Sequence, residues 1–261
     1  MRYGFVRTIV RRLIAIRHRL FRRARSTLLK ARWSRHASEY LPSKPEEVET
    51  EAVFDRVSIV AINLESRPDR LEELTKELRA LGIGRWQRVS ALDGRAAFPA
   101  LDSFFSGSVG CSLSHVLALE RENWEGREAL LILEDDVEFL VNKTALAHSI
   151  HEFLENPAID VLALYGKSRR GGSHRISSNL QIVSGLVGTV CYVVKPHMGP
   201  IVADLFTRGV PALLRGRRNG KSDILWNRLQ VRKYFFAAPN SPYAQNRAGF
   251  SDIEGRVLGP R

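Results

Sequence analysis

Residues 129–136 read ALLILEDD, an unbroken apolar run that ends in three acidic residues. An apolar run without polar alternation is typical of a strand buried on both faces of a parallel sheet. Residues 57–62 (VSIVAI) repeat the pattern and are followed by the polar residue Asn63. Because helical patterns separate the apolar runs, the sequence predicts an α/β fold whose sheet has parallel members.

The remaining elements follow from periodicity and from turn residues. Ser66 is expected to cap the first of the helices, with Pro68 in its first turn. Further strands are predicted over residues 86–91, 160–165, 189–194 and 234–237. Helices are predicted over residues 66–81, 111–122, 144–154, 196–207 and 222–230.

The net charge of +12 is concentrated at the N-terminal end of the 261-residue chain. Residues 1–38 contain twelve of the 40 basic residues and no acidic residue, which leaves 28 of each sign in the rest. A body without net charge argues against a domain that binds nucleic acid over its whole surface. The length suits one domain with appendages.

Residues 1–38 place apolar side chains at helical spacing among arginines, which predicts a basic amphipathic helix at an anionic membrane surface. A disordered basic tail and an arginine-rich targeting peptide are alternatives. Residues 39–56 contain two prolines and are predicted as a linker, so residues 57–261 form the expected main domain. The N-terminal apolar residues are interrupted by arginines too often for a secretory signal.

Ligands of such sheets bind beyond the carboxyl ends of the strands. Asn63 follows the first apolar strand, and Arg67 and Arg70 lie at the start of the next helix. Helix-start amides and arginines favour a phosphate or another anion. The alternative is a capped helix with solvated arginines.

Glu134, Asp135 and Asp136 lie at the end of the central apolar run. Their mutual repulsion calls for a cation, and carboxylate oxygens suit Mg²⁺ or Mn²⁺, which leave room for phosphate oxygens. Asp136 is close enough to Glu134 to share one ion, whereas Asp135 is expected to contact a donor sugar. The alternative is a solvated acidic turn, or the start of a helix at which the acidic side chains interact favourably with the helix dipole.

Two further side chains are open to more than one interpretation. His115, in GCSLSH, is either structural or a base, and Asp223, at the start of a predicted helix, is either a cap or a general base. The two cysteines, Cys111 and Cys191, cannot form a disulfide framework and suit a reducing compartment. They also lack the Cys-x-x-Cys spacing of thiolate metal sites.

Taken in order, these segments resemble glycosyltransferase family 25, the proteins similar to lipooligosaccharide galactosyltransferases. Single motifs such as EDD are weak, but seven in the right order are specific, and they cover nearly all of residues 57–253. The matching segments are INLESRPDR (62–70), SALDG (90–94), GCSLSH (110–115), ALLILEDDV (129–137), GTVCYVV (188–194), SDILW (222–226) and AQNRAGFSDI (244–253).

The resemblance implies a GT-A-like nucleotide-sugar-binding fold, a mixed sheet flanked by helices. It also implies transfer of a hexose, commonly galactose, from a UDP-sugar to a lipooligosaccharide- or lipopolysaccharide-type glycan acceptor, with inversion. The nucleotide-sugar residues so implied are Asn63, Arg67, Arg70, Asp93, Asp135 and Gln245, with Ser251–Asp252 closing over the donor. Glu134 and Asp136 hold Mn²⁺ or Mg²⁺, and the general base is Asp223, with His115 in reserve.

Two hypotheses follow. The first is a UDP-sugar-dependent glycosyltransferase that is cytoplasmic, lies on the inner face of the cell membrane through residues 1–38, and binds no nucleic acid. The second is a non-catalytic protein that binds membrane or nucleic acid through its basic arm. The absence of net charge in residues 39–261 and the acidic residues at the end of the central apolar run favour the first hypothesis. The donor sugar, the linkage and the oligomeric state do not follow from either hypothesis.

Overall fold

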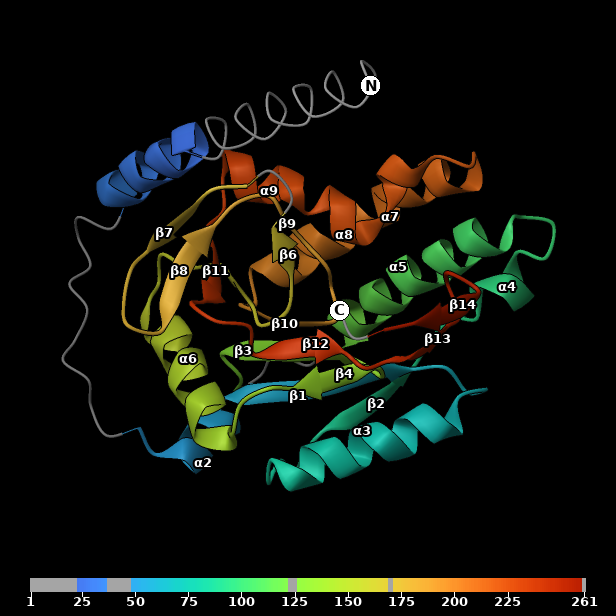
Figure 1. Ribbon diagram of the computed structural model, residues 1–261, viewed down its shortest axis with the longest axis horizontal. Coiled ribbons are helices and arrows are strands. Elements are labelled where there is room, and N and C mark those ends of the chain that lie inside the picture. Colours follow the sequence, from blue (N-terminus) through green and yellow to red (C-terminus); the bar gives the residue numbers. More distant parts are fainter. Residues whose placement is uncertain (1–22, 37–47, 122–125, 169–170, 260–261) are drawn as a thin grey trace, which may run out of the picture.

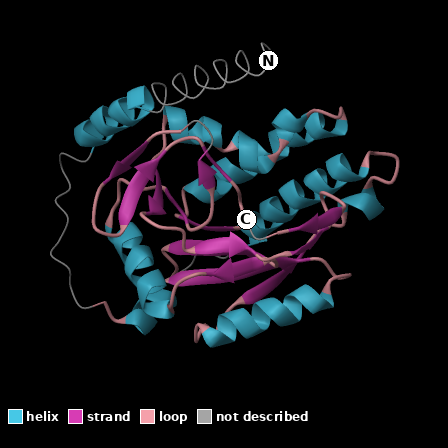
Figure 2. Cartoon of the chain, in the orientation of Figure 1, coloured by secondary structure: helices cyan, strands magenta, loops and turns pink. Residues whose placement is uncertain are grey.

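The computed structural model describes residues 23–36, 48–121, 126–168 and 171–259. Its centre is an eight-stranded mixed sheet with the order β2-β1-β3-β10-β5-β11-β8-β7. Helices cover both faces of this sheet, which confirms the predicted α/β class with a mixed sheet flanked by helices (Figures 1 and 2).

The strands of the central sheet are β1 (Val57–Asn63), β2 (Gln87–Ser90), β3 (Ala129–Glu134), β5 (Val161–Ala163), β7 (Ser173–Arg175), β8 (Leu180–Val183), β10 (Cys191–Val194) and β11 (Phe236–Pro239). Three two-stranded sheets are formed by β4 (Val137–Phe139) with β12 (Ala244–Asn246), β6 (Lys167–Ser168) with β9 (Leu186–Val187), and β13 (Gly249–Ser251) with β14 (Arg256–Leu258). The helices are α2 (Thr50–Asp55), α3 (Pro68–Ala80), α4 (Gly94–Ala97), α5 (Ser103–Arg121), α6 (Lys143–Glu155), α7 (Met198–Leu214), α8 (Ser222–Leu225) and α9 (Asn227–Arg232), with a 3₁₀ turn, η2, at Arg218–Gly220.

The apolar run of β3 lies in the interior of the sheet, paired in parallel with β1 and in antiparallel with β10. Successive side chains of a strand point to opposite faces. Leu131 and Leu133 therefore belong to the core formed with α3 and α6, whereas Leu130 and Ile132 belong to the core formed with α5 and α7. Burial on both faces explains why this segment needs apolar residues at every position (Figure 1).

Six strands, β1, β2, β3, β5, β7 and β11, run in the same direction, while β8 and β10 run against them. The carboxyl ends of the six strands therefore lie along one edge of the sheet. Cys191 pairs with Leu133 near that edge, so the chain entering β10 lies beside the acidic end of β3. This shared edge is where the side chains of the candidate site converge.

Several predicted elements differ in detail from those in the structure. The helix over residues 66–81 begins with Pro68 after Arg67, so Ser66 does not cap it. The helix over 111–122 starts earlier, at Ser103, and the helix over 222–230 is split into α8 and α9. Thr50–Asp55, predicted as linker, is helix α2, because Val53 is buried in the core beside α6. Residues 39–47 of that linker lie outside the described residues.

The arm predicted over residues 1–38 is described only from residue 23, and residues 23–36 are helical. This N-terminal helix (residues 23–36) packs on the main domain, which the sequence did not predict. Leu29 and Trp33 are buried, and Trp33 makes an edge-to-face contact with Phe235, with the ring centroids 5.1 Å apart. Arg32 donates hydrogen bonds to the carbonyl oxygens of Gln230 and Tyr234. Part of the apolar face of this helix therefore covers protein.

Two adjacent leucines of the N-terminal helix allow a matched test of this packing. Leu29 is 5% exposed and Leu28 is 69% exposed. Leu29→Ala is expected to lower the free energy of unfolding by about 2–3 kcal/mol, because it removes buried methyl groups and leaves a cavity. Leu28→Ala should change it by less than about 0.5 kcal/mol. Denaturant unfolding of both variants measures this, and equal effects would contradict the docked position.

No helix among the described residues is long and apolar enough to cross a membrane.

Candidate functional site

Two adjoining cavities, of about 180 Å³ and 130 Å³, lie at the carboxyl edge of the sheet. Both are lined by Arg70, Cys111, Glu134 and Asp136. The smaller extends over the ends of β1 and β2, and the larger extends toward the start of α8. The β13–β14 hairpin contributes wall residues to the larger one and therefore lies beside the acidic end of β3, whereas closure of residues 251–252 over a donor stays a prediction.

Glu134 ends β3 and is held by two neighbours. Its Oε1 accepts a hydrogen bond from the Thr189 hydroxyl at 2.9 Å and lies 3.1 Å from Nε2 of His115. Burial raises the pKa of Glu134, but the hydrogen bonds from His115 and Thr189 and the charge of His115 outweigh it, so the pKa lies below its usual value. Glu134 is therefore held in the ionised form that a cation requires.

Asp135 points away from a shared position with Glu134. Its Oδ2 accepts a hydrogen bond from the Asn63 amide at 2.8 Å, and its Oδ1 accepts one from Arg70 at 2.9 Å. Burial raises the pKa of Asp135, and the positive charge of Arg70 opposes that shift. Asp135 therefore fixes the start of α3 against the end of β3, although it also contributes to the wall of the smaller cavity.

Within the acidic triplet, Asp136 differs from its neighbours because one of its carboxylate oxygens is buried and makes no hydrogen bond to the described residues. Its Oδ2 accepts from the Asn246 amide at 3.1 Å, whereas Oδ1 has no hydrogen-bonding partner among the described residues. Burial and the negative charges of Glu134 and Asp135 raise the pKa of Asp136 to about 7. A buried carboxylate oxygen without a partner, next to a second carboxylate, fits the ligand set of a hard divalent cation.

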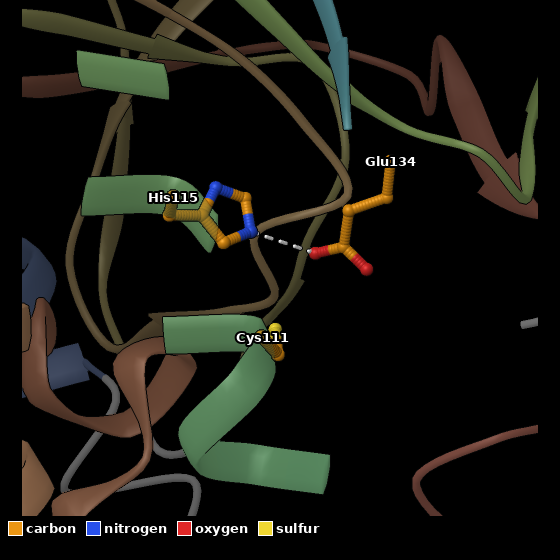
Figure 3. Close-up of side chains that lie close together, drawn as sticks. All are labelled: Cys111, His115 and Glu134. Carbon is orange, nitrogen blue, oxygen red and sulfur yellow. Dashed lines mark hydrogen bonds and ion pairs between the residues drawn. The ribbon is translucent and has the colours of Figure 1, made fainter. Parts of the chain in front are cut away.

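His115 is fully buried on α5, and both of its ring nitrogens have partners. Nδ1 lies 3.1 Å from the hydroxyl of Tyr192, and Nε2 lies 3.1 Å from Glu134. Both contacts suit a side chain that orients Glu134, and the ring also lines the smaller cavity. Cys111 lies one helical turn earlier on the same face, and Figure 3 shows its sulfur near the other two side chains. Burial raises the pKa of the Cys111 thiol well above its usual value.

The two arginines predicted to bind a diphosphate are paired with carboxylates in the structure. Arg67 forms ion pairs with Asp69 at 2.7 Å and with Asp252 at 2.6 Å. Arg70 pairs with Asp135, lies 3.6 Å from Asp252, and donates a hydrogen bond to the carbonyl oxygen of Phe250. Of the two, Arg70 lines both cavities. The arginines therefore tie the C-terminal segment to the start of α3.

Asn63, predicted to contact a nucleotide, is 1% exposed. Its amide nitrogen donates to Asp135 and to the Arg67 carbonyl oxygen at 2.9 Å, and its amide oxygen accepts from Arg88 at 3.1 Å. A buried amide with these bonds positions its neighbours. Asn63 therefore joins the end of β1 to the acidic triplet.

Asp93 caps the short helix α4 by accepting hydrogen bonds from the backbone amides of Arg95 and Ala96, and it lines the smaller cavity. The glycine after it, Gly94, is needed because a Cβ there would lie 1.9 Å from the carbonyl oxygen of Ser106. The close approach of α4 to α5 fixes the SALDG loop beside the GCSLSH segment. A contact of Asp93 with the nucleotide sugar stays a prediction.

Gln245 does not reach the two acidic cavities. It pairs with Glu138 in the β12–β4 sheet, and its side-chain amide donates to the Glu138 carboxylate at 2.8 Å. Its neighbour Asn246 pairs with Val137 and reaches Asp136. Because adjacent residues of a strand point to opposite sides, Asn246 and not Gln245 reaches the acidic triplet, and a contact of Gln245 with the donor stays a prediction. Gln245 lines a third cavity, of about 570 Å³.

Asp223 lies in the first turn of α8 and lines the larger acidic cavity together with Glu134 and Asp136. Its Oδ1 is 3.8 Å from the ammonium nitrogen of Lys221. The residue that caps α8 is Lys221 and no side-chain capping bond is formed there, so the interpretation of Asp223 as a cap is not supported.

Three residues that contact predicted side chains of the site were not themselves predicted: Thr189, Tyr192 and Asn246. Thr189 is the first residue of the predicted strand over 189–194, and Tyr192 lies within that strand. A polar side chain in an otherwise apolar strand was the signal that could have identified them. Asn246 lies next to Gln245, the residue predicted to contact the nucleotide sugar. All three hold a predicted side chain in place.

No protein-family model matches the sequence, and a search of curated proteins finds no match. A solved structure described as a mannose-1-phosphate geranyltransferase from Thermus thermophilus is similar in chain course. It is 14% identical, with a TM-score of 0.39, and the match covers 78% of this chain and 75% of that chain. At this level of similarity nothing is inferred about activity. Membership of glycosyltransferase family 25 stays a prediction.

Proposed function

We propose that the chain is a glycosyltransferase similar to family 25. It transfers a hexose, expected to be galactose, from a UDP-sugar to a lipooligosaccharide- or lipopolysaccharide-type glycan, with inversion and with Mn²⁺ or Mg²⁺ as cofactor. The observation that carries the proposal is the buried Oδ1 of Asp136, which lacks a hydrogen bond beside the ionised Glu134. This pair lies at the carboxyl end of the central strand.

Glu134 and Asp136 are the residues that would hold the cation. When bound, Mn²⁺ or Mg²⁺ neutralises the negative charge that develops on a departing UDP. Thr189 and His115 orient Glu134, and Asn246 orients Asp136. Arg70 lines the same cavities, and its guanidinium can pair with a diphosphate once the contact to Asp252 opens.

Asp223 is the proposed general base. An inverting displacement requires a group that accepts the proton of the attacking hydroxyl. Asp223 lines the larger acidic cavity together with Asp136, and its Oδ1 lies 3.8 Å from the Lys221 ammonium nitrogen. Asp223 accepts that proton at a carboxylate oxygen, and Arg70 lines the same cavity.

The third cavity has the size and lining suited to the acceptor. It lies beyond the carboxyl ends of β5 and β11, and Tyr165 lines both this cavity and the larger acidic one. Gln181, Asn240 and Gln245 supply amides that can hydrogen bond to sugar hydroxyls. Ser26 of the N-terminal helix forms part of its wall. A glycolipid held near the membrane would therefore reach the site past this helix.

Product analysis tests the proposed reaction. The chain is incubated with UDP-galactose, Mn²⁺ and a truncated lipooligosaccharide, and the new linkage is examined by NMR. A β-linked product formed from the α-linked donor is expected. An α-linked product would contradict inversion, and transfer from another UDP-hexose alone would replace galactose as the donor.

We also propose that residues 1–22 attach the protein to an anionic membrane surface. They contain seven of the twelve basic residues of the arm, and each base near such a surface contributes about 1 kcal/mol at best. A chain that starts at residue 23 retains the docked N-terminal helix. It is expected to bind phosphatidylglycerol vesicles more than about tenfold more weakly than the full chain. Neutral phosphatidylcholine vesicles are the control, and equal binding by both chains would refute the idea.

A further inference from the structure

Cys111, His115 and Glu134 bring three different metal-ligand types together. Their ligand atoms, one from each side chain, all lie within 4.8 Å of one another (Figure 3). Cys111 and His115 are four residues apart on α5 and therefore share one helix face. Glu134 approaches from the end of β3 and already lies 3.1 Å from Nε2 of His115.

From these contacts we propose that Cys111, His115 and Glu134 form a binding site for a thiophilic divalent cation such as Zn²⁺. Sulfur and imidazole ligands select Zn²⁺ over Mg²⁺ and Mn²⁺. Neighbouring ligands of a tetrahedral zinc lie about 3.4–3.6 Å apart. The 3.1 Å between Nε2 of His115 and Oε1 of Glu134 needs to open slightly to reach this separation. The sulfur of Cys111 lies within 4.8 Å of both atoms, so it needs to approach by at most about 1 Å.

The residues around the cluster provide the outer hydrogen bonds that metal ligands use. The Tyr192 hydroxyl lies beside Nδ1 of His115 and can accept a hydrogen bond from it. In the tautomer that carries its proton on Nδ1, the lone pair of Nε2, which now faces Glu134, can bind the metal. Thr189 donates to Glu134 and fixes its carboxylate. Cys111 and Glu134 both line the larger acidic cavity, which gives the ion an entry path and an open coordination position.

Each ligand atom that carries a proton loses it as its bond to the metal forms. The thiol proton of Cys111, and any proton on Nε2 of His115, pass to solvent. Because Glu134 is also the proposed ligand of Mn²⁺ or Mg²⁺, Zn²⁺ in this site withdraws that carboxylate and inhibits transfer. This consequence rests on the proposed function, whereas the site itself does not.

Cobalt binding to the full chain tests the site directly, because Co²⁺ is a visible stand-in for Zn²⁺. Tetrahedral Co²⁺ with a thiolate ligand is expected to give visible absorption bands and a sulfur-to-cobalt charge-transfer band. Cys111→Ser should abolish that charge-transfer band. It should also weaken the Zn²⁺ affinity, measured by displacement of Co²⁺, by more than about 100-fold, since even changes to residues that only hold the ligands in place lower metal affinity by up to that factor. Cys191→Ala, which removes the other cysteine, and Asp136→Asn should both retain the band.

The absence of a charge-transfer band at saturating Co²⁺, or an unchanged band in Cys111→Ser, would overturn the proposal. If Cys111→Ser fails to fold, zinc X-ray absorption of the unmodified chain decides, since one sulfur neighbour is expected and none contradicts the site. Mn²⁺-dependent release of UDP is measured on the same preparation. Turnover without the cobalt band refutes only the zinc site, and a cobalt band without any turnover refutes only the proposed function.

Discussion

Asp136→Ala is expected to lower metal-dependent UDP-sugar turnover by more than about 100-fold while the fold is retained. A bound cation supplies several kcal/mol of charge stabilisation, and each 1.4 kcal/mol corresponds to about a factor of ten. Asp136 provides the buried oxygen without a hydrogen bond, and without it Glu134 would be left as the only carboxylate of the proposed ligand pair. Turnover at saturating Mn²⁺ measures the loss.

Stability separates this expectation from simple misfolding. Removing a carboxylate that is buried and repelled by two neighbours should leave the metal-free melting temperature unchanged or raised. Mn²⁺ should raise the melting temperature of the unmodified chain and not that of the variant. Asp204→Ala, which removes an exposed carboxylate paired with Arg208 on α7, is the matched control. A fully active Asp136→Ala variant would rule out Asp136 as a metal ligand.

Asp223→Asn should reduce turnover by about 10²–10⁴-fold and leave UDP binding in the presence of Mn²⁺ unchanged. The substitution keeps the size and the position of the side chain in α8 but removes its ability to accept a proton. A general base acts on the acceptor hydroxyl, so its loss affects the chemical step and not the affinity for the nucleotide. Steady-state turnover and calorimetric titration with UDP give the two quantities.

The same two measurements, turnover and UDP affinity, also show whether another residue is the general base. Near-normal turnover in Asp223→Asn would exclude it as the base. His115 would be the next residue to consider, although both of its ring nitrogens are already engaged. A combined loss of turnover and UDP binding would instead indicate that Asp223 contributes to the shape of the cavity.

The parts of the fold that were predictable are those in which neighbouring residues of the sequence act together. ALLILEDD contains both the reason for a central strand and the acids at its end, so their placement at the carboxyl edge followed from sequence. Asp223 was placed at a helix start that the sequence pattern indicated, whereas the short helix that Asp93 caps was not predicted. The identity of the contacts they make depended on neighbours from other elements.

The parts that were missed depend on pairing between distant segments. Whether Gln245 or Asn246 faces Asp136 is decided by the register of β12 on β4, which lies far earlier in the chain. The same holds for the cluster of Cys111 with Glu134, which a search for Cys-x-x-Cys spacing cannot detect. Leu29 and Trp33 belong to an amphipathic pattern that does not say whether lipid or protein covers its apolar face.

Release of UDP from a panel of common UDP-sugars, with and without Mn²⁺, tests the central claim most directly. The full chain is used, and Asp136→Ala serves as the blank for contaminating activity. Release from at least one UDP-hexose is expected, dependent on Mn²⁺ or Mg²⁺ and absent in the blank. If no UDP-sugar is turned over and UDP itself does not bind, the acidic end of β3 is not a nucleotide-sugar site and the proposed function is wrong.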